Sequence, residues 1–265
     1  MPSDPGENTP LLELIDVSAQ SGGYAVLNGV RAAFQAGTTS VILGPTGSGK
    51  SALVKAAAGL LVPSGGKVLY RGRDMAKFHQ KDEMEFRAKS GFVFQDSALW
   101  ANSNILTNVT LPLRVHKPWM SQSDVAEAAR LTLKRIGYEE GMAVRPSDLS
   151  MGEQKMVSIA RAIIHDPDIV FMDDPGAGLD EDGLELLFKL ISDLEREGKT
   201  MIIAANSSEL AYRFADMLGI VVDGALIALG SYDETLARAE NEPGLKLERL
   251  RSRGSRQRKG RRETT

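Results

Sequence analysis

Short apolar runs alternate with longer stretches of helical period along most of this chain. The short runs predict strands, and they lie at residues 12–17, 30–34, 40–43, 67–70, 169–172, 201–205, 218–222 and 225–228. The runs at 40–43 and 169–172 contain no charged residue, which is typical of a strand buried in a sheet. Strands that alternate with helices in this way predict an α/β fold. No internal repeat is visible in the sequence.

The longer stretches place apolar residues on one face of a helix. Between residues 123 and 136 the apolar positions recur every three to four residues, and Ser123 with Asp124 provides the expected cap. Helices are predicted on the same grounds at residues 52–58, 123–136, 152–165 and 184–197. The middle of the chain is therefore helical in character.

A glycine-rich loop joins the strand at 40–43 to the helix at 52–58. Glycines let successive backbone N–H groups turn toward phosphate oxygens, and the helix that follows presents its positive end. In such a loop the lysine reaches the β- and γ-phosphates, and the next hydroxyl binds the metal. The loop predicts a site for ATP and Mg²⁺ at Gly44, Pro45, Thr46, Gly47, Ser48, Gly49, Lys50 and Ser51.

Two carboxylates follow the apolar run at 169–172. A carboxylate at the carboxyl end of a strand beside a phosphate loop is where Mg²⁺ is held, and Asp173 fits that role. Asp174 would then orient or deprotonate the attacking water. The alternative is that Asp173 and Asp174 are only a polar strand end before the turn at Pro175.

Composition excludes some classes of protein. The 265 residues include no cysteine, which excludes disulfides and thiolate metal sites. The apolar stretch at 217–230 is interrupted by Asp223 and is too short to span a bilayer, and the first residues do not resemble a signal peptide. We expect a soluble, cytoplasmic protein that reaches a membrane only through a partner.

Charge is distributed unevenly along the chain. Residues 246–265 hold nine Lys and Arg against Glu248 and Glu263, whereas residues 1–245 carry 23 basic and 33 acidic side chains. The basic tail is either a solvated appendage or a contact with an acidic partner or an anionic membrane surface. Nucleic-acid binding is not expected, because the acidic body would repel the phosphate backbone.

A second motif lies between the phosphate loop and the acidic strand end. It reads Leu149, Ser150, Met151, Gly152, Glu153, Gln154, and the chain also carries Gln95 after Phe92-Val93-Phe94 and the sequence Gly178-Leu179-Asp180. With the loop at 44–51 and Asp173, this ordered set resembles the ATP-binding-cassette (ABC) ATPases over about residues 12–235.

The resemblance implies a fold, partners and roles for the motif residues. It implies a P-loop ATPase core with an antiparallel β subdomain and a helical subdomain at about residues 96–166, in a cassette at 12–240. A disordered segment would precede it at 1–11, and the basic tail would follow at 241–265. Two cassettes, in a homodimer by preference, would enclose ATP head to tail. Ser150 and Gly152 would face the γ-phosphate bound by the partner cassette, Gln95 would sense metal and water, and Asp180 would link the two sites.

Several positions depart from the family pattern, mostly at positions for hydrolysis. Asp174 stands where a glutamate is usual, Asn206 where a histidine is usual, Met151 for a glycine and Glu153 for a glutamine. Ser21 aligns with the aromatic residue that packs on adenine, with Tyr24 three residues later. One hypothesis is a slow ATPase with Asp174 as base and Asn206 at the γ-phosphate; the other is a regulatory cassette paired with a more competent one.

The segment after Gln95 indicates which membrane system the chain serves. Its sequence through Arg114 is similar to that of the ATPase subunits of Mce and Mla lipid transporters, which work with a permease and a lipid-binding subunit. We expect a permease to dock near Ala98, Leu99 and Trp100, with the chain peripheral on the inner face of the membrane. Core packing of Leu99 and Trp100, another ABC importer or release system, and a soluble assembly ATPase are the alternatives.

Overall fold

The computed structural model describes residues 9–138 and 141–239, and the chain divides into two compact units. The first unit consists of Met1–Arg73 and Ala204–Thr265, and the second of Asp74–Ile203. The expected basic tail lies outside the described residues, as does most of the expected N-terminal segment.

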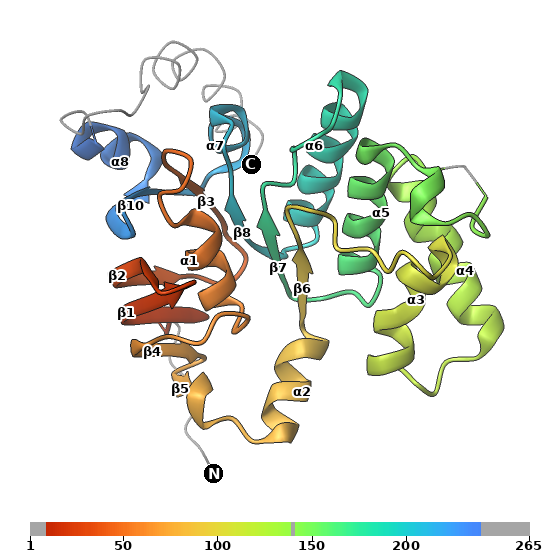
Figure 1. Cartoon of the computed structure of the whole chain (residues 1–265), viewed down its shortest axis with the longest axis horizontal. Helices are drawn as coiled ribbons and strands as arrows, with labels where there is room; N and C mark the ends of the chain where they lie inside the picture. Colours follow the sequence, from red (N-terminus) through yellow and green to blue (C-terminus); the bar gives the residue numbers. More distant parts are fainter. Residues whose placement is uncertain (1–8, 139–140, 240–265) are drawn as a thin grey trace. The chain divides into compact units, whose positions relative to one another are not determined.

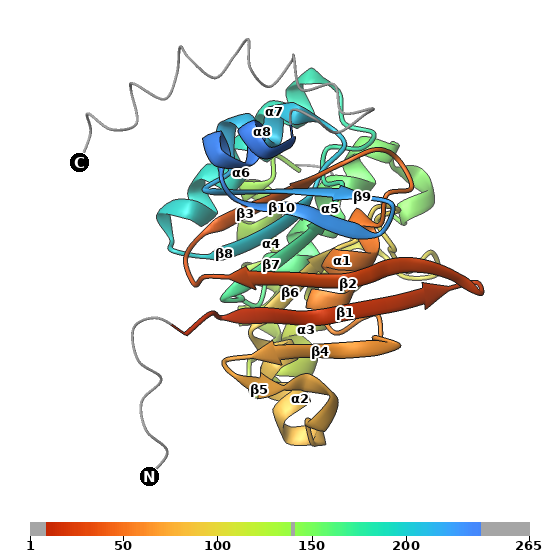
Figure 2. The same cartoon turned by 90° about the vertical axis from the view of Figure 1, so that its left-hand side faces the viewer.

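An antiparallel sheet forms one part of the first unit. It contains β1 (Leu12–Ser21), β2 (Tyr24–Phe34) and β4 (Gly65–Tyr70), with β1 in the centre. Leu12 pairs with Phe34 on one side and with Tyr70 on the other, and the three long strands lie side by side in Figure 2. Leu12 and Leu14 are buried, as are Val17 and Ala19 after a register shift, so each part of β1 has the two-residue period of a strand with one apolar face.

The phosphate loop belongs to the other part of the first unit. There β3 (Thr39–Leu43) runs parallel to β9 (Met217–Val222), which pairs antiparallel with β10 (Ala225–Ser231). All five residues of β3 are buried, which explains its unbroken apolar sequence. Three helices accompany these strands: α1 (Lys50–Ala57), α7 (Ser208–Phe214), which packs on β3, and α8 (Tyr232–Ala239), which packs on β9 and β10.

The second unit contains strands and the helical middle of the chain (Figure 1). Its strands follow the order β8 (Thr200–Ala204), β7 (Ile169–Asp173), β6 (Ser90–Val93), and β6 and β7 are parallel. The helices are α2 (Gln80–Ala88), α3 (Ile105–His116), α4 (Gln122–Arg135), α5 (Met151–Ile163) and α6 (Glu181–Arg196). Helix α5 is central, because it packs against α3, α4, α6 and β6. The short strand β5 (Arg73–Asp74) lies at the boundary of the units, and short 3-10 turns at Met75–Lys77 and Pro146–Asp148 complete the secondary structure.

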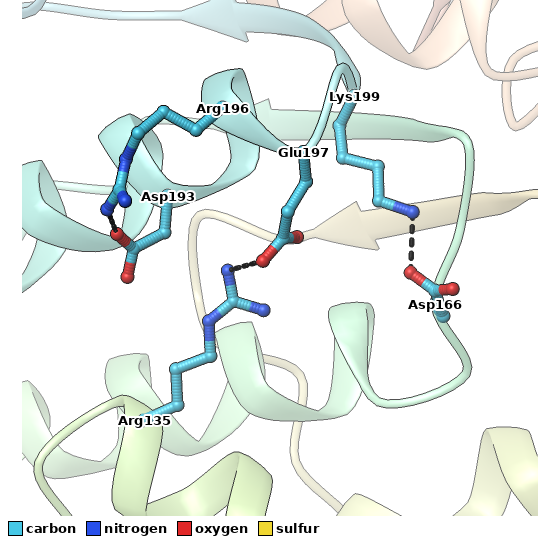
Figure 3. A network of polar contacts seen from close by, with 6 residues as sticks. All are labelled: Arg135, Asp166, Asp193, Arg196, Glu197 and Lys199. Atoms are coloured by element: carbon cyan, nitrogen blue, oxygen red, sulfur yellow. Dashed lines mark hydrogen bonds and ion pairs between the residues drawn. The ribbon is translucent and has the colours of Figure 1, made fainter.

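Ion pairs tie the carboxyl end of α6 to other parts of the second unit (Figure 3). Arg135 at the end of α4 donates to Glu197 at 2.7 Å, and Lys199 pairs with Asp166 after α5. Arg196 pairs with Asp193 within α6 itself. One partner of each pair is solvent-exposed, so each pair contributes about 0–1 kcal/mol. Their effect is to fix the ends of helices already held by apolar packing.

Two details of the helical region differ from the sequence prediction. Ser121 caps α4 by accepting a hydrogen bond from Asp124 N at 3.2 Å, so the expected cap at Ser123 and Asp124 was wrong by two residues. Helix α3 was not predicted as an element, because Pro112 lies inside it and an internal proline normally ends a helix. Among the described residues, the structure has no helix that is both long enough and apolar enough to cross a membrane.

Candidate functional site

The loop from Gly44 to Ser51 connects β3 to α1 in the first unit. Its glycines Gly44, Gly47 and Gly49 have φ angles of 156°, 81° and 104°, which residues other than glycine rarely adopt. Gly49 is the N-cap of α1, and the first turn of that helix carries no acidic residue. Backbone N–H groups at a helix N-terminus without a local carboxylate form a site for an anion.

Two of these glycines also lie too close to neighbouring backbone to carry a side chain. A Cβ at Gly44 would stand 2.1 Å from Val221 O in β9, and one at Gly49 would stand 2.5 Å from Val26 O in β2. Around a Cβ at Gly47, no non-neighbouring atom of the described residues lies within 4 Å. Gly44 and Gly49 are therefore needed because a side chain would not fit there, whereas Gly47 is needed only for its backbone angle.

Hydrogen bonds hold the loop to distant parts of the first unit. Gly224 N, in the turn between β9 and β10, donates to Ser48 O at 2.8 Å, and Asn28 N in β2 donates to Gly224 O at 2.9 Å. Asn28 Nδ2 also donates to Asp223 O at 2.9 Å. The loop, β2 and the β9–β10 turn thus form one hydrogen-bonded assembly.

Lys50 and Ser51 begin α1 at the end of the loop. The Lys50 ammonium donates to Gly44 O and Pro45 O, both at 2.9 Å, so this buried cation lies across the loop rather than in solvent. Ser51 is half-buried in the first turn of α1. A charged donor, a hydroxyl and a ring of backbone N–H groups are the groups that bind a triphosphate with its metal.

The acidic strand end lies in the second unit. Asp173 is the last residue of β7 and is only 1% exposed. Asp174 follows with a φ of 48°, a left-handed conformation that aspartate tolerates better than most side chains. Its carbonyl accepts from Ala177 N at 3.1 Å, which closes the turn after the strand. The two carboxylates therefore have different surroundings, one buried in the strand and one half-buried in the turn.

Gln95 lies two residues beyond β6, where the backbone turns away from the sheet. Its side chain is exposed, while its carbonyl and that of Phe94 accept hydrogen bonds from the buried ammonium of Lys155. Burial lowers the pKa of Lys155, and the carboxylates of Asp174, Asp173 and Asp96 oppose this shift. The structure thus brings Gln95 and the acidic strand end to one cation, which the sequence did not suggest.

The signature motif forms the N-terminus of α5. Ser150 Oγ accepts from Glu153 N at 3.2 Å, and the Glu153 carboxylate accepts from Ser150 N at 2.7 Å, which makes a capping box. This arrangement explains Glu153, because its carboxylate is turned back onto the helix end. Met151 in the first turn is 77% exposed and Gly152 is partly exposed.

The sequence Gly178-Leu179-Asp180 lies beside the signature motif within the second unit. A Cβ at Gly152 would lie 3.5 Å from Gly178 O, and one at Gly178 would lie 3.8 Å from the Cβ of Met151. Asp180 caps α6 by accepting from Gly183 N at 2.9 Å. The signature helix and the loop before α6 therefore meet at one surface.

The remaining predicted residues lie in turns and loops that follow strands. Asn206 belongs to the first unit, two residues after the end of β8, and is exposed. Beside it, Ala205 N donates to Ile42 O of the same unit. Tyr24 is 79% exposed and pairs with Ser21 across the turn between β1 and β2. In the second unit Ala98 is exposed, Leu99 is half-buried and Trp100 is 53% exposed, so Trp100 is not a core residue within that unit.

These residues fit Mg²⁺ and ATP in kind. Mg²⁺ typically keeps several waters and is bound by one or two carboxylates together with substrate phosphates. Among residues 9–138 and 141–239, no group of three or more His, Cys, Asp or Glu could hold a metal ion alone. A single buried carboxylate at Asp173, a hydroxyl at Ser51 and an amide at Gln95 match a metal that arrives with a nucleotide.

Fold and motifs together define a class of nucleotide-hydrolysing subunit, and comparison with known families agrees. The ABC transporter family model matches residues 27–177, more than half of the chain, and the chain therefore belongs to that family. It is an ATP-binding subunit with the ABC ATPase fold, as the sequence predicted.

Two curated relatives match this chain to a similar extent, but their names assign them to different transport systems. The intermembrane phospholipid transport system ATP-binding protein MlaF of Haemophilus influenzae is 29% identical over 230 residues, which cover 86% of this chain and 87% of that protein. The octopine permease ATP-binding protein P of Rhizobium radiobacter is 29% identical over 248 residues, which cover 90% and 94%.

A solved structure is similar along nearly its whole length. It is a dimeric ATP-binding cassette in a post-hydrolysis state with ADP and Pi, with a TM-score of 0.77 and 28% identity, covering 83% of this chain and 98% of that one. ABC cassettes thus form dimers, and the family's members in transporters work with membrane permeases.

Sequence reasoning missed two residues at the site, Lys155 and Arg161. Both are on α5 and donate to backbone carbonyls of the segment after β6. The available signal was a lysine on the apolar face of the predicted helix at 152–165, where a charge must find buried partners.

Proposed function

We propose that the loop from Gly44 to Ser51 binds the phosphates of ATP, and that Asp173, Ser51 and Gln95 hold Mg²⁺. The observation that carries this proposal is the loop itself, with glycine backbone angles, no space for a Cβ at Gly44 or Gly49, and Lys50 across its mouth. Mg²⁺ supplies neutralisation of the phosphate charge. Lys50 and the N–H groups of the loop bind and orient the triphosphate.

Lys50→Ala tests this assignment. Removing the cation should weaken ATP binding by about a hundredfold or more, because a buried charge-assisted contact is lost. Binding is measured by titration calorimetry with Mg·ATP, and circular dichroism checks the fold. Unchanged affinity in a folded variant would refute the phosphate site.

For hydrolysis we propose Asp174 as the base that accepts a proton from the attacking water. Asn206 donates a hydrogen bond to the γ-phosphate, and Ser150 and Gly152 of a second copy complete the site, with Asp180 linking the two. The half-buried position of Asp174 directly after Asp173 supports the first role. We predict slow turnover for two reasons. The Asp174 carboxylate is one methylene farther from the water than a glutamate carboxylate would be. The Asn206 amide can donate a hydrogen bond to the γ-phosphate but cannot carry the positive charge of a histidine.

We further propose that the chain drives lipid transport, as a peripheral subunit at the inner face of a membrane. The similarity of the segment after Gln95 to Mce and Mla ATPases, and the named phospholipid system of the Haemophilus influenzae relative, support this substrate class. The permease would dock near Ala98, Leu99 and Trp100, where an exposed tryptophan follows an exposed alanine. A lipid-binding subunit of the Mce type would complete the system.

Native purification of the tagged chain tests the transport proposal. A permease and a membrane-anchored lipid-binding protein should co-purify in stoichiometric amounts. Trp100→Ala should reduce the recovered permease, whereas the matched change Trp119→Ala, at a more exposed tryptophan, should not. Recovery of an amino-acid permease, or of soluble partners alone, would refute the lipid assignment and leave the ATP site intact.

A second candidate is a regulatory cassette paired with a more competent one. It rests on the three departures Asp174, Asn206 and Met151, with Met151 exposed at the first turn of α5. The same purification distinguishes the candidates, because a second kind of cassette would be recovered with the chain. A complex containing only this cassette favours the homodimer.

A further inference from the structure

Two cations of α5 hold the backbone between Phe94 and Ala98. Lys155 Nζ donates to Phe94 O at 3.0 Å and to Gln95 O at 2.5 Å. Arg161 donates to Ala98 O at 2.8 Å through Nη1 and to Ser97 O at 2.9 Å through Nη2. Four carbonyls are thus bound by two side chains that lie six positions apart on one helix.

The segment needs such support because its backbone is unfavourable by itself. Ser97 and Ala98 have φ angles of 63° and 46°, and each left-handed residue other than glycine costs about 1–2 kcal/mol. Ser97 N donates to Phe94 O, which forms a tight turn. A conformation of this kind persists only where surrounding contacts fix it.

Helix α3 fixes the far side of the same segment. Trp100 N donates to Asn108 Oδ1 at 2.7 Å, and Asn108 Nδ2 donates to Trp100 O at 3.1 Å. Asn108 is buried, so these bonds are protected from water. The residues from Phe94 to Trp100 are therefore held by side chains of two helices, with Lys155 at the end that carries Gln95.

We propose that Lys155 is a positioning residue that sets the place of Gln95 relative to the acidic strand end. Its buried ammonium, 2% exposed as a residue, bonds the carbonyl of Gln95 and attracts the carboxylates of Asp173, Asp174 and Asp96. Lys155 thereby fixes the backbone of Gln95 and attracts the carboxylates with which the Gln95 side-chain amide is to act. This inference rests on the proposed role of Gln95.

Two substitutions of Lys155 test its charge and hydrogen bonds together, and one substitution elsewhere is the control. Lys155→Met keeps the apolar stem and removes the side-chain donor from the carbonyls of Phe94 and Gln95, and Lys155→Arg keeps both charge and donors. Lys134→Met on α4 is the matched control, because Lys134 is exposed. If Lys155→Met fails to fold, Lys155→Gln takes its place, since an amide can still donate to one carbonyl.

The first experiment measures kcat and KM for ATP in the purified complex of the full chain. Lys155→Met should lower kcat by about 10–100-fold with KM within about threefold, because a displaced Gln95 affects turnover more than binding. Lys155→Arg should recover most of kcat, and Lys134→Met should match the wild type. Unchanged kcat in folded Lys155→Met, or a loss confined to KM, would overturn the proposal.

A double-mutant cycle separates this inference from the proposed role of Gln95. Gln95→Ala alone should lower kcat, and Lys155→Met should then cause little further loss, because both changes affect the same group. If Gln95→Ala has no effect, the role of Gln95 fails. If Gln95→Ala is slow but Lys155→Met adds its full loss in that background, only the positioning role fails.

A second experiment does not depend on turnover. The chain has two tryptophans, Trp100 and Trp119, so Trp119→Phe leaves Trp100 as a reporter two residues beyond Ala98. In this background Lys155→Met should raise the rate constant for acrylamide quenching by about twofold, because a freed segment exposes the ring more often. Lys134→Met should not change it. Equal quenching in Lys155→Met and wild type would refute the positioning role.

Discussion

The phosphate loop of the first unit and the acidic strand end of the second unit are built by different means. The loop is shaped by backbone: glycine angles, carbonyl contacts of Val221 and Val26, and hydrogen bonds to the β9–β10 turn. The strand end is shaped by side chains, with Lys155 bonded to the carbonyl of Gln95 and attracted by Asp173 and Asp174. Side chains change by single substitutions more readily than a packed backbone does. The loop keeps its full motif, whereas Asp174, Met151 and Glu153, three of the departures from the family pattern, lie in the unit of the acidic strand end.

Gly49→Ala should distort the phosphate loop, the region shaped by backbone contacts, and its effect is the largest we expect. The new Cβ would stand 2.5 Å from Val26 O at a φ of 104°. Relief requires the loop to shift, which should weaken ATP binding by about a hundredfold or more and cost about 3 kcal/mol of stability. Calorimetric titration and urea unfolding measure the two effects. Gly47→Ala is the control: it has open space, so its stability cost should be about 1 kcal/mol. Equal losses in both variants would contradict the packing argument.

In the region shaped by side chains, Asp174→Glu should raise the turnover number for ATP. The longer side chain advances the carboxylate by about 1 Å, which should raise kcat by about tenfold or more if Asp174 is the base. The gain is limited by the φ of 48°, which glutamate adopts less readily than aspartate. Steady-state ATPase assays at saturating ATP test this, with Asp174→Asn as the inactive reference. No change in kcat would favour the regulatory cassette.

A buried histidine side chain should also make the stability of the second unit depend on pH. His165 packs its ring 5.4 Å from that of His116 and shares a hydrogen bond with Ser90 O at 3.1 Å. Burial lowers the pKa of His165 to about 4, and burial also lowers the pKa of His116. Between about pH 6.5 and pH 4 the unfolded chain binds a proton that folded His165 does not. Stability therefore falls as pH falls through this window, by about 3 kcal/mol for His165.

Urea unfolding at a series of pH values tests this dependence. His165→Gln should flatten the decline between pH 6.5 and pH 4, whereas His79→Gln, at an exposed histidine, should leave it unchanged. A slope that persists in His165→Gln would assign the proton uptake to other groups.

Glu153→Gln should have the smallest effect. The glutamine keeps the capping box with Ser150 N but removes a carboxylate from the N-terminus of α5. The positive end of the helix is then more available to a phosphate from a second copy, which should tighten ATP-dependent dimerisation by less than about 1 kcal/mol. Analytical ultracentrifugation with Mg·ATP measures the change. Weaker dimerisation would show that the carboxylate supports the contact.

The sequence predicts this protein best where the information is local. The strand at 40–43, the glycine loop and the helix after it are contiguous, so their order and the α/β fold followed from the pattern. Helix α3 was missed because Pro112 lies in its interior, and α3 packs against α5, whose residues are distant in sequence. Lys155 was missed because its partners lie about 60 residues away in sequence. The roles of Asp174, Gln95, Ser150 and Asn206 stay predictions, since they depend on groups from a nucleotide and a second cassette.

The hydrogen bonds among Ser48, Gly224 and Asn28 have a consequence for synthesis of the protein. The loop that follows β3 is completed by a turn that is made almost 180 residues later. A nascent chain that ends before residue 224 lacks the donor to Ser48 O and the acceptor for Asn28 N, and the carbonyl of Val221 that packs on Gly44 is added only three residues before that turn. Nucleotide binding should therefore appear only after nearly the whole described chain has left the ribosome, which makes ATP a ligand of finished chains and not of fragments.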